Sequence, residues 1–304
     1  MLQDLNYITS KLMNLEKPKK PKMLVVDDEP DNLDLLYRTF RRDYNVFRAE
    51  SGVQALEVLA KEGEVAVIIS DQRMPEMKGT EFLSKTVPQF PDTIRIILTG
   101  FTDVEDLVDA INSGQVYKYI TKPWEPNELK IVVQRAADTY IILKQRTEEL
   151  QKSQSQTQLL SEILQIGQKE ENVTDIVSKI PHIFTQILNV DNCILQLVKG
   201  DELDNIQGVS SASLTNWLQD DSLAKEAIAH QKMQVWTTNS DKIISDAEKY
   251  QKADIQVHLV IPIIYRGKVL AVLSLQWHHL GQFTEDDLKF LYLSGQEIGL
   301  IVNG

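Results

Sequence analysis

The sequence has only one cysteine, Cys193, among its 304 residues. A single cysteine excludes an intrachain disulfide and favours a reducing setting, so we expect a cytoplasmic protein. Long apolar runs are also missing, since none approaches the roughly 18 residues that a membrane-spanning helix needs. The acidic, polar N-terminus lacks a signal-peptide pattern. We therefore expect no membrane association.

Positive charge is scarce as well. Lysine and arginine number 32 against 44 aspartates and glutamates, giving a formal net charge of -12. Such a chain is a poor non-specific binder of nucleic acid or anionic membrane. No basic recognition helix, helix-turn-helix, kinase, cyclase or phosphodiesterase pattern is visible, so we expect no direct DNA binding. The length and a hydrophobic content of 42% predict about two domains, each with its own core.

The chain begins with a segment, residues 1–22, that we interpret as a short amphipathic helix followed by the linker "KPKKPK". From residue 23 to 140, short β-rich runs alternate with helical patterns. The runs are apolar on both faces, as in a parallel sheet covered by helices on both sides. We predict a doubly wound α/β fold with strands at 23–26, 44–49, 65–70, 94–100 and 118–121. Its helices are predicted at 31–42, 52–62, 79–90, 103–114 and from 126.

The last of these helices has no stop signal where the domain should end. Ten positions spaced alternately by three and four residues form a seam with an apolar start and a polar middle. They are Val133, Ala136, Tyr140, Leu143, Thr147, Leu150, Gln154, Thr157, Ser161 and Leu164. We interpret residues 141–171 as a linker helix that forms a parallel coiled coil, and we expect a homodimer. A single solvated helix is the alternative.

Residues 172–304 predict a second domain of the α+β class, built around an antiparallel sheet. The pattern places a helix at 173–188, interrupted by Pro181, and strands near 192–200, 205–210 and 234–238. Another helix is expected over 214–231, a hairpin over 257–277 with Gly267 in its turn, and a last helix over 283–302. Thr284, followed by three acidic residues, is a suitable cap for that helix.

Polar residues follow the strands of the first domain. Asp27 and Asp28 end the first strand, Asp71 the third, Thr99 the fourth and Lys122 the fifth. The carboxyl ends of parallel strands meet at one edge of the sheet, so these side chains should converge. Any one of them could be a helix cap or an exposed residue. Together, three carboxylates require a cation, and hard oxygen ligands select Mg²⁺. A carboxylate there could attack phosphorus and form an acyl phosphate.

These residues lie in segments that resemble the response-regulator receiver domain of two-component signalling: "LVVDDEP", "SDQRMPEMKGTEFL", "IILTG" and "YITKP". The resemblance implies that Asp71 accepts a phosphoryl group from a phosphohistidine on a sensor histidine kinase. It also implies that Asp28, Asp71 and the backbone carbonyl of Arg73 hold Mg²⁺, with Asp27 acting through metal-bound water. The chain would then be a signalling protein and not an enzyme, apart from phosphoryl uptake and slow self-dephosphorylation.

The same resemblance assigns the remaining residues. Lys122 would contact the phosphoryl group and precede a cis peptide bond to Pro123. Thr99 would close onto the phosphoryl group, and Tyr119 would swing inward with it. Gln72 and Arg73 would occupy variable positions that tune hydrolysis, and Gly100 would give Thr99 backbone freedom. Trp124 is bulky, and apart from the resemblance we interpret it as a packing residue.

Residues 172–304 resemble a GAF domain through "VIPIIYRGKVLAVLSLQ" followed by "FTEDDLKFL". Members of this family bind cyclic nucleotides, bilins, haem or small acids, or dimerise without a ligand, and the ligand here is unknown. No histidine follows Cys193, so we interpret Cys193 as a core residue and not a bilin attachment site. His278 and His279 lack nearby partner ligands and are interpreted as surface residues.

Three functions remain open from the sequence. The first is a phosphorylation-switched protein whose output is protein binding or dimerisation. The second is a sensor whose GAF domain binds a small molecule, and a deep pocket between its sheet and residues 213–231 would favour it. The third is an enzyme with a site in the C-terminal half, for which no motif is visible.

Overall fold

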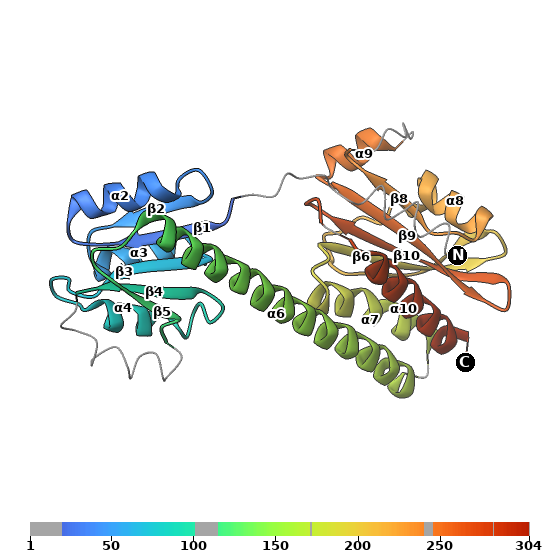
Figure 1. The fold of residues 1–304 in the computed structure, drawn as a ribbon. Helices are drawn as coiled ribbons and strands as arrows, with labels where there is room; N and C mark the ends of the chain where they lie inside the picture. The colour runs from blue at the N-terminus through green and yellow to red at the C-terminus, as the bar shows by residue number, and fades with distance from the viewer. Residues whose placement is uncertain (1–19, 101–114, 171, 240–245, 282, 304) are drawn as a thin grey trace. The chain divides into compact units, whose positions relative to one another are not determined.

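The computed structural model describes residues 20–100, 115–170, 172–239, 246–281 and 283–303. The chain forms two compact units that divide in sequence between Leu150 and Gln151 (Figure 1). Within the described ranges, no helix combines the length and the apolar character needed to cross a membrane. The helices predicted over residues 1–17 and 103–114 lie outside the described residues.

A five-stranded parallel sheet forms the centre of the first unit, in the order β2-β1-β3-β4-β5. The sequence prediction of a doubly wound parallel sheet is confirmed. β3 and β4 are buried along their whole length, which explains their continuous apolar runs. The strands are β1 (Lys22–Val26), β2 (Asn45–Ala49), β3 (Val67–Asp71), β4 (Ile94–Thr99) and β5 (Lys118–Thr121).

Helices cover both faces of this sheet (Figure 1). On one face, α2 (Pro30–Phe40) and the start of α6 (Pro126–Lys169) pack through Leu36 and Val133. On the other, α3 (Gly52–Glu62) and α4 (Gly79–Thr86) pack through Leu59 and Phe82. Because alternate strand residues face opposite sides, the two cores share the same strands. This arrangement fixes the carboxyl ends of the strands, where the predicted site residues lie.

Helix α6 is a single helix of 44 residues. The apolar start of the predicted coiled-coil seam is not exposed on it. Val133 and Ala136 are fully buried in the core of the first unit, and Tyr140 and Leu143 pack against that core. The first four seam positions therefore serve the packing of the helix on its own sheet. Further along, Leu150 and Leu164 are exposed, at 61% and 47%.

The second unit contains a five-stranded antiparallel sheet in the order β7-β6-β10-β9-β8 (Figure 1). Its long central hairpin joins β9 to β10 with Gly267 at positive φ in the turn, as the sequence predicted. The α+β prediction is confirmed. The strands are β6 (Asn192–Lys199), β7 (Glu202–Val209), β8 (Gln234–Thr237), β9 (Val257–Tyr265) and β10 (Lys268–Trp277).

One face of this sheet packs on α7 (Val173–Ile187), α10 (Glu285–Asn303) and, through Leu159 and Ile163, the last part of α6. The opposite face carries the short helix η2 (Leu218–Asp220), α8 (Ser222–His230) and α9 (Ala247–Lys252). The single helix predicted over 214–231 is thus two helices, and α9 was not predicted. The cap at Thr284 is confirmed, since its Oγ1 accepts the Asp287 N–H at 3.2 Å.

The predicted interruption at Pro181 is wrong, because α7 runs through it without a break. A proline within a helix leaves the carbonyl four residues earlier without its amide partner, which here is Val177. That carbonyl oxygen lies against β7 at Gly208, where a Cβ would stand only 2.0 Å from it. Gly208 lets the strand approach the freed carbonyl, so packing maintains a helix that the local sequence disfavours.

Candidate functional site

Asp27 lies at the carboxyl end of β1 and is fully buried. Its Oδ1 accepts the Glu29 N–H and the Asn32 Nδ2–H, each at 3.0 Å. Its Oδ2 accepts a hydrogen bond from Nζ of Lys122 at 3.0 Å. A buried carboxylate needs such partners to remain charged. Both oxygens of Asp27 are therefore oriented by the loop that follows β1 and by the end of β5.

Asp71 ends β3 and is 6% exposed. Its Oδ2 accepts the Arg73 N–H at 2.6 Å, and its Oδ1 forms an ion pair with Lys122. Burial raises the pKa of Asp71, while the Lys122 ammonium and the Arg73 N–H oppose that rise. Its carboxylate lies buried at the edge where the sequence predicts a nucleophile.

Lys122 follows β5 and bridges the two carboxylates, with ion pairs to both Asp27 and Asp71. Burial by itself would lower the pKa of Lys122, but the hydrogen bonds and charges of the two aspartates outweigh it and raise that pKa. The ammonium is therefore charged at neutral pH. The peptide bond from Lys122 to Pro123 is cis, as the resemblance implied.

The other predicted residues lie at the same edge with different surroundings. Thr99 ends β4, is 1% exposed and donates from Oγ1 to the Gly100 carbonyl at 3.1 Å. It pairs in register with Thr121, directly before Lys122. Asp28, the residue after Asp27, is exposed. Tyr119 packs partly against the core on the α3 and α4 side of the sheet.

Gln72 and Arg73, the two predicted tuning positions, differ in exposure. Gln72 is 2% exposed, and its Oε1 accepts the Thr80 N–H of α4 at 3.1 Å. The exposed Arg73 extends from the end of β3 to the end of β4. Its Nη2 stands 3.2 Å from the point that a Cβ on Gly100 would occupy. Gln72 thus anchors α4, whereas the Arg73 side chain reaches the residue after Thr99.

Sequence reasoning missed two residues that shape this site. Gly79 begins α4, and a Cβ there would stand 2.1 Å from the Asp71 carbonyl oxygen. Only glycine allows this approach of α4 to β3. The other is Asn32, whose amide orients Asp27. An asparagine in the first turn of a helix is too common at such positions to signal this role.

The predicted metal ligands are oxygen donors from the ends of β1 and β3. Among the residues that the structure describes, no group of three or more His, Cys, Asp or Glu side chains has the arrangement of a metal site. Asp27 and Asp71 instead share the Lys122 ammonium between them. These two carboxylates therefore form a position that accommodates positive charge.

In the second unit, aromatic side chains fill the space between the sheet and the helices η2, α8 and α9. The ring centroid of Tyr250 lies 5.3 Å from that of Trp217, 4.9 Å from Trp236 and 5.0 Å from His258. The Tyr250 hydroxyl donates to the buried carboxylate of Asp221, which also caps α8. This is a packed aromatic and polar core.

Three residues considered earlier are also placed in the second unit. Cys193 is fully buried in the sheet core, where burial raises the pKa of its thiol. His278 and His279 are exposed after β10, and His279 Nδ1 lies 3.5 Å from Oδ2 of Asp191. The core interpretation of Cys193 and the surface interpretation of the histidines are confirmed.

Comparison with known proteins agrees with this geometry. Residues 23–134 match the family model of the response regulator receiver domain, and residues 170–303 match that of the GAF domain. A chemotaxis protein CheY homolog of Campylobacter jejuni is 35% identical over 113 residues, which are 36% of this chain and 86% of that protein. The chain belongs to the response-regulator family. Its receiver fold and its GAF domain are those expected from the sequence.

Two further proteins match less than half of this response regulator. The hydrogenase transcriptional regulatory protein HoxA of Cupriavidus necator is 38% identical over 120 residues, which are 40% of this chain and 25% of HoxA. The chain therefore spans about a quarter of the length of that relative. A solved structure described as an adenylate cyclase from Rhodopirellula baltica is 32% identical with a TM-score of 0.43, covering 44% of this chain and 99% of that one.

Proposed function

We propose that Asp71 accepts a phosphoryl group from a phosphohistidine of a sensor histidine kinase. The observation that supports this most directly is the buried Asp71 carboxylate, oriented by the Arg73 N–H and paired with Lys122. In the step, an Asp71 oxygen forms a bond to phosphorus as the bond from phosphorus to the imidazole nitrogen breaks. The products are an acyl phosphate and the free histidine. Lys122 would pair with the added phosphoryl oxygens.

Mg²⁺ fits the donor set at this edge. The residues that would hold it are Asp28, Asp71 and the backbone carbonyl of Arg73, with Asp27 acting through water. The Lys122 ammonium between Asp27 and Asp71 supports this fit, because that pair already accommodates a cation. When bound, the ion supplies neutralisation of the phosphoryl oxygens. Thr99 and Tyr119 are proposed as the switch residues that respond to the added group.

The proposed output is protein binding or dimerisation through α6 and the GAF domain, with a receiver at 23–140, a linker helix at 141–171 and a GAF domain at 172–304. The aromatic packing around Tyr250 supports an interaction module over the ligand sensor considered above, because rings fill the space where a deep pocket was required. Nothing in the described residues favours an enzyme site in that half, and no catalytic role is proposed for it.

The substitution Asp71→Asn tests the acceptor. It keeps the side-chain shape but removes the nucleophilic carboxylate, so labelling by a phosphodonor with Mg²⁺ should fall to background. The measurement is acid-labile phosphate by intact-protein mass spectrometry. Asp43→Asn, an exposed aspartate in the same unit, should label like the wild type. Labelling of Asp71→Asn at the wild-type level would refute the assignment.

A further inference from the structure

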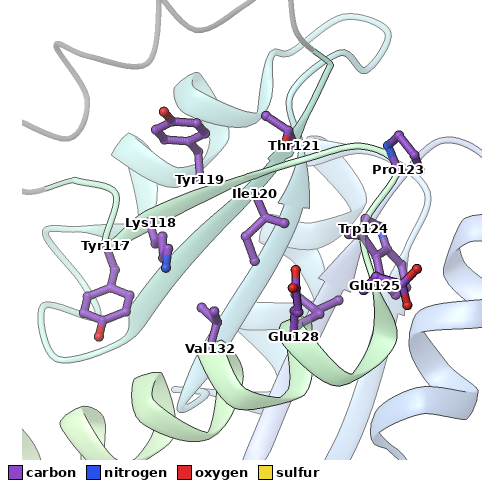
Figure 2. Close-up of a pocket in the computed structure, with 11 residues that line it drawn as sticks. Tyr117, Lys118, Tyr119, Ile120, Thr121, Pro123, Trp124, Glu125, Glu128 and Val132 are labelled. Carbon is purple, nitrogen blue, oxygen red and sulfur yellow. The ribbon is translucent and has the colours of Figure 1, made fainter.

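Helix α6 begins beside β5, the strand that leads to the proposed acceptor site. Its first turns face the strand across a groove of about 540 Å³, with Glu128 and Val132 opposite Ile120 (Figure 2). Two residues after Ile120, Lys122 pairs with Asp71. Because side chains do not fill this groove, the start of α6 has room to shift against β5.

The other end of α6 is part of the second unit. Leu159 and Ile163 are fully buried in the core that the antiparallel sheet forms with α7 and α10. Val133 is equally buried in the core of the first unit. One continuous helix is therefore built into two cores. A rigid element of this kind can carry a displacement from one core to the other.

A polar contact holds α6 at the amino end of α10. Lys152 Nζ lies 2.6 Å from Oδ1 of Asp287 and 3.3 Å from Oγ1 of Thr284. The same two residues cap α10, since Asp287 Oδ2 accepts the Thr284 N–H at 2.8 Å and Thr284 Oγ1 accepts the Asp287 N–H at 3.2 Å. Lys152 thus contacts the capping group itself, at the point where α10 starts.

A second contact lies near the carboxyl ends of both helices. A Cβ on Gly167 would stand 2.5 Å from Cγ2 of Ile301. Gly167 is not at positive φ, so the close approach of α10 explains the glycine. The two contacts are 15 residues apart on α6, from 152 to 167, and 14 apart on α10, from 287 to 301. The helices therefore run side by side in the same direction, and both contacts oppose sliding.

α10 packs just as closely on the sheet. A Cβ on Gly299 would stand 2.9 Å from Cγ2 of Ile263, and one on Gly295 would stand 3.5 Å from Cγ2 of Ile261. Both isoleucines belong to β9, which forms the central hairpin with β10. α10 thus contacts α6 on one side and β9 on another. Since close-packed interiors transmit strain, a shift of α6 must be met by α10.

We propose that α10 moves with α6, so that phosphorylation of Asp71 alters the contact between α10 and β9. Regulation then acts on this face of the GAF sheet, and not on the aromatic core around Tyr250 on the opposite face. The trigger rests on the proposed acceptor role of Asp71. The coupling of α6 to α10 does not, because the contacts of Lys152 and Gly167 carry it.

Hydrogen exchange of the full chain without phosphodonor tests the coupling. Lys152→Met should speed amide exchange in α10 about twofold to fivefold, as expected for the loss of a partly exposed ion pair. Lys169→Met, an exposed lysine on the same part of α6, is the matched control. Glu64→Gln, which releases Lys144 in the first unit, should also speed exchange in α10, by a smaller factor. Wild-type exchange of α10 in Glu64→Gln would overturn the coupling.

Gly167→Ala separates packing from helix formation. Alanine favours a helix over glycine, so without a packing role the variant should exchange more slowly. We expect faster exchange in α10 and β9, because the added Cβ pushes Ile301 away. In an Ile301→Ala background, which removes the nearest atom, Gly167→Ala should have little effect. Slower exchange in the single variant would contradict the proposal.

Labelling by a phosphodonor with Mg²⁺ then tests the regulation. Wild type labelled on Asp71 should show altered exchange in α10 and β9 and unaltered exchange around Tyr250. Asp71→Asn under the same conditions should show no change. Absence of labelling in the wild type would refute the acceptor role and with it the trigger. Unaltered exchange of α10 in fully labelled protein would overturn the proposal itself.

Discussion

Lys122 balances the negative charges of the proposed acceptor site. Its ammonium stands between Asp27 and Asp71, both of which are nearly inaccessible to solvent. Without it, two buried carboxylates would face each other with no cation. Breaking a buried ion pair is costly because the remaining charge is left uncompensated.

Lys122→Met should therefore destabilise the receiver domain by about 1–3 kcal/mol at pH 7 in the absence of Mg²⁺. Loss of the Lys122 ammonium removes a group that lowers the pKa of Asp71, so that pKa rises further and protonation of Asp71 relieves the repulsion between the two carboxylates. The difference in the free energy of unfolding between the wild type and Lys122→Met should therefore shrink as the pH falls towards 5. Urea unfolding at several pH values measures this. Lys118→Met, an exposed lysine on the same strand, should show neither effect.

His258 provides a second prediction at the residue scale. It is completely buried, and burial lowers its pKa from 6.5 to about 3. Its Nε2 lies 2.9 Å from the Ser274 hydroxyl, and its Nδ1 has no partner within the described residues. The folded GAF domain thus holds the neutral imidazole, while the unfolded chain would protonate it near its ordinary pKa.

The stability that His258 contributes is complete above pH 6.5 and is lost as the pH falls from 6.5 towards 3. The loss should reach a few kcal/mol near pH 3. Asp221, whose pKa is raised by burial, acts in the opposite direction at acid pH. The test is therefore the difference in melting temperature between wild type and His258→Phe, followed by calorimetry. That difference should change in favour of the variant between pH 7 and pH 4, and a constant difference would contradict the prediction.

At the scale of the elements, α6 is attached to the receiver domain well beyond its first turns. Lys144 Nζ lies 2.7 Å from Oε2 of Glu64, which precedes β3. Thr147 Oγ1 lies 3.4 Å from Oδ1 of Asp92, which precedes β4. Both contacts are at the amino-terminal edge of the sheet, opposite the proposed acceptor site. They extend the packed part of α6 past Tyr140.

Glu64→Gln should loosen this attachment. The ion pair is partly exposed, so the loss of stability should be only about 0.5–1 kcal/mol. The clearer result should be faster amide exchange over residues 141–150, with little change over 126–137, where Leu129, Val133 and Ala136 are buried. Mass spectrometry of exchanged peptides would measure it. Glu57→Gln, an exposed glutamate of α3, serves as control. If amide exchange over residues 141–150 is the same in Glu64→Gln and in the wild type, the ion pair does not hold this part of α6.

The elements also show what a sequence can predict. The strands of both sheets were predicted because their apolar runs are short and bounded by polar residues, and the site followed from their carboxyl ends. The seam on α6 was misinterpreted at its start because a helix that packs on a sheet has the same spacing of apolar residues as a coiled coil. Val133 and Ala136 satisfy both patterns. Pro181 was misinterpreted because the approach of Gly208 depends on contacts distant in sequence, as does that of Gly79 to Asp71.

At the scale of the whole molecule, the homodimer remains a prediction. Because the start of the seam is buried, the exposed seam residues of α6 are those from Leu150 onward, with Leu150 and Leu164 as its apolar positions. A coiled coil with so few apolar residues in its seam should be only marginally stable. A coupling free energy of roughly 1–3 kcal/mol between phosphorylation and helix association is therefore enough to shift its equilibrium.

Cysteine crosslinking tests this dimer. Leu150→Cys should crosslink between copies, and the yield should change when the protein is incubated with a phosphodonor and Mg²⁺. The native Cys193 is buried and should not react. Gln145→Cys, an exposed position on α6 outside the seam, is the control. A monomer by light scattering with and without phosphodonor would refute the dimer, and identical crosslinking in both conditions would refute its coupling to phosphorylation.

The placement of the tryptophans has an optical consequence. The chain has four, and three of them, Trp217, Trp236 and Trp277, lie in the GAF domain. Trp124 alone belongs to the receiver domain, where it follows the cis peptide bond between Lys122 and Pro123 and packs against the core. With the other three replaced by phenylalanine, its emission would report on one domain only. The receiver domain thus carries a single fluorophore two residues after Lys122 of the proposed acceptor site.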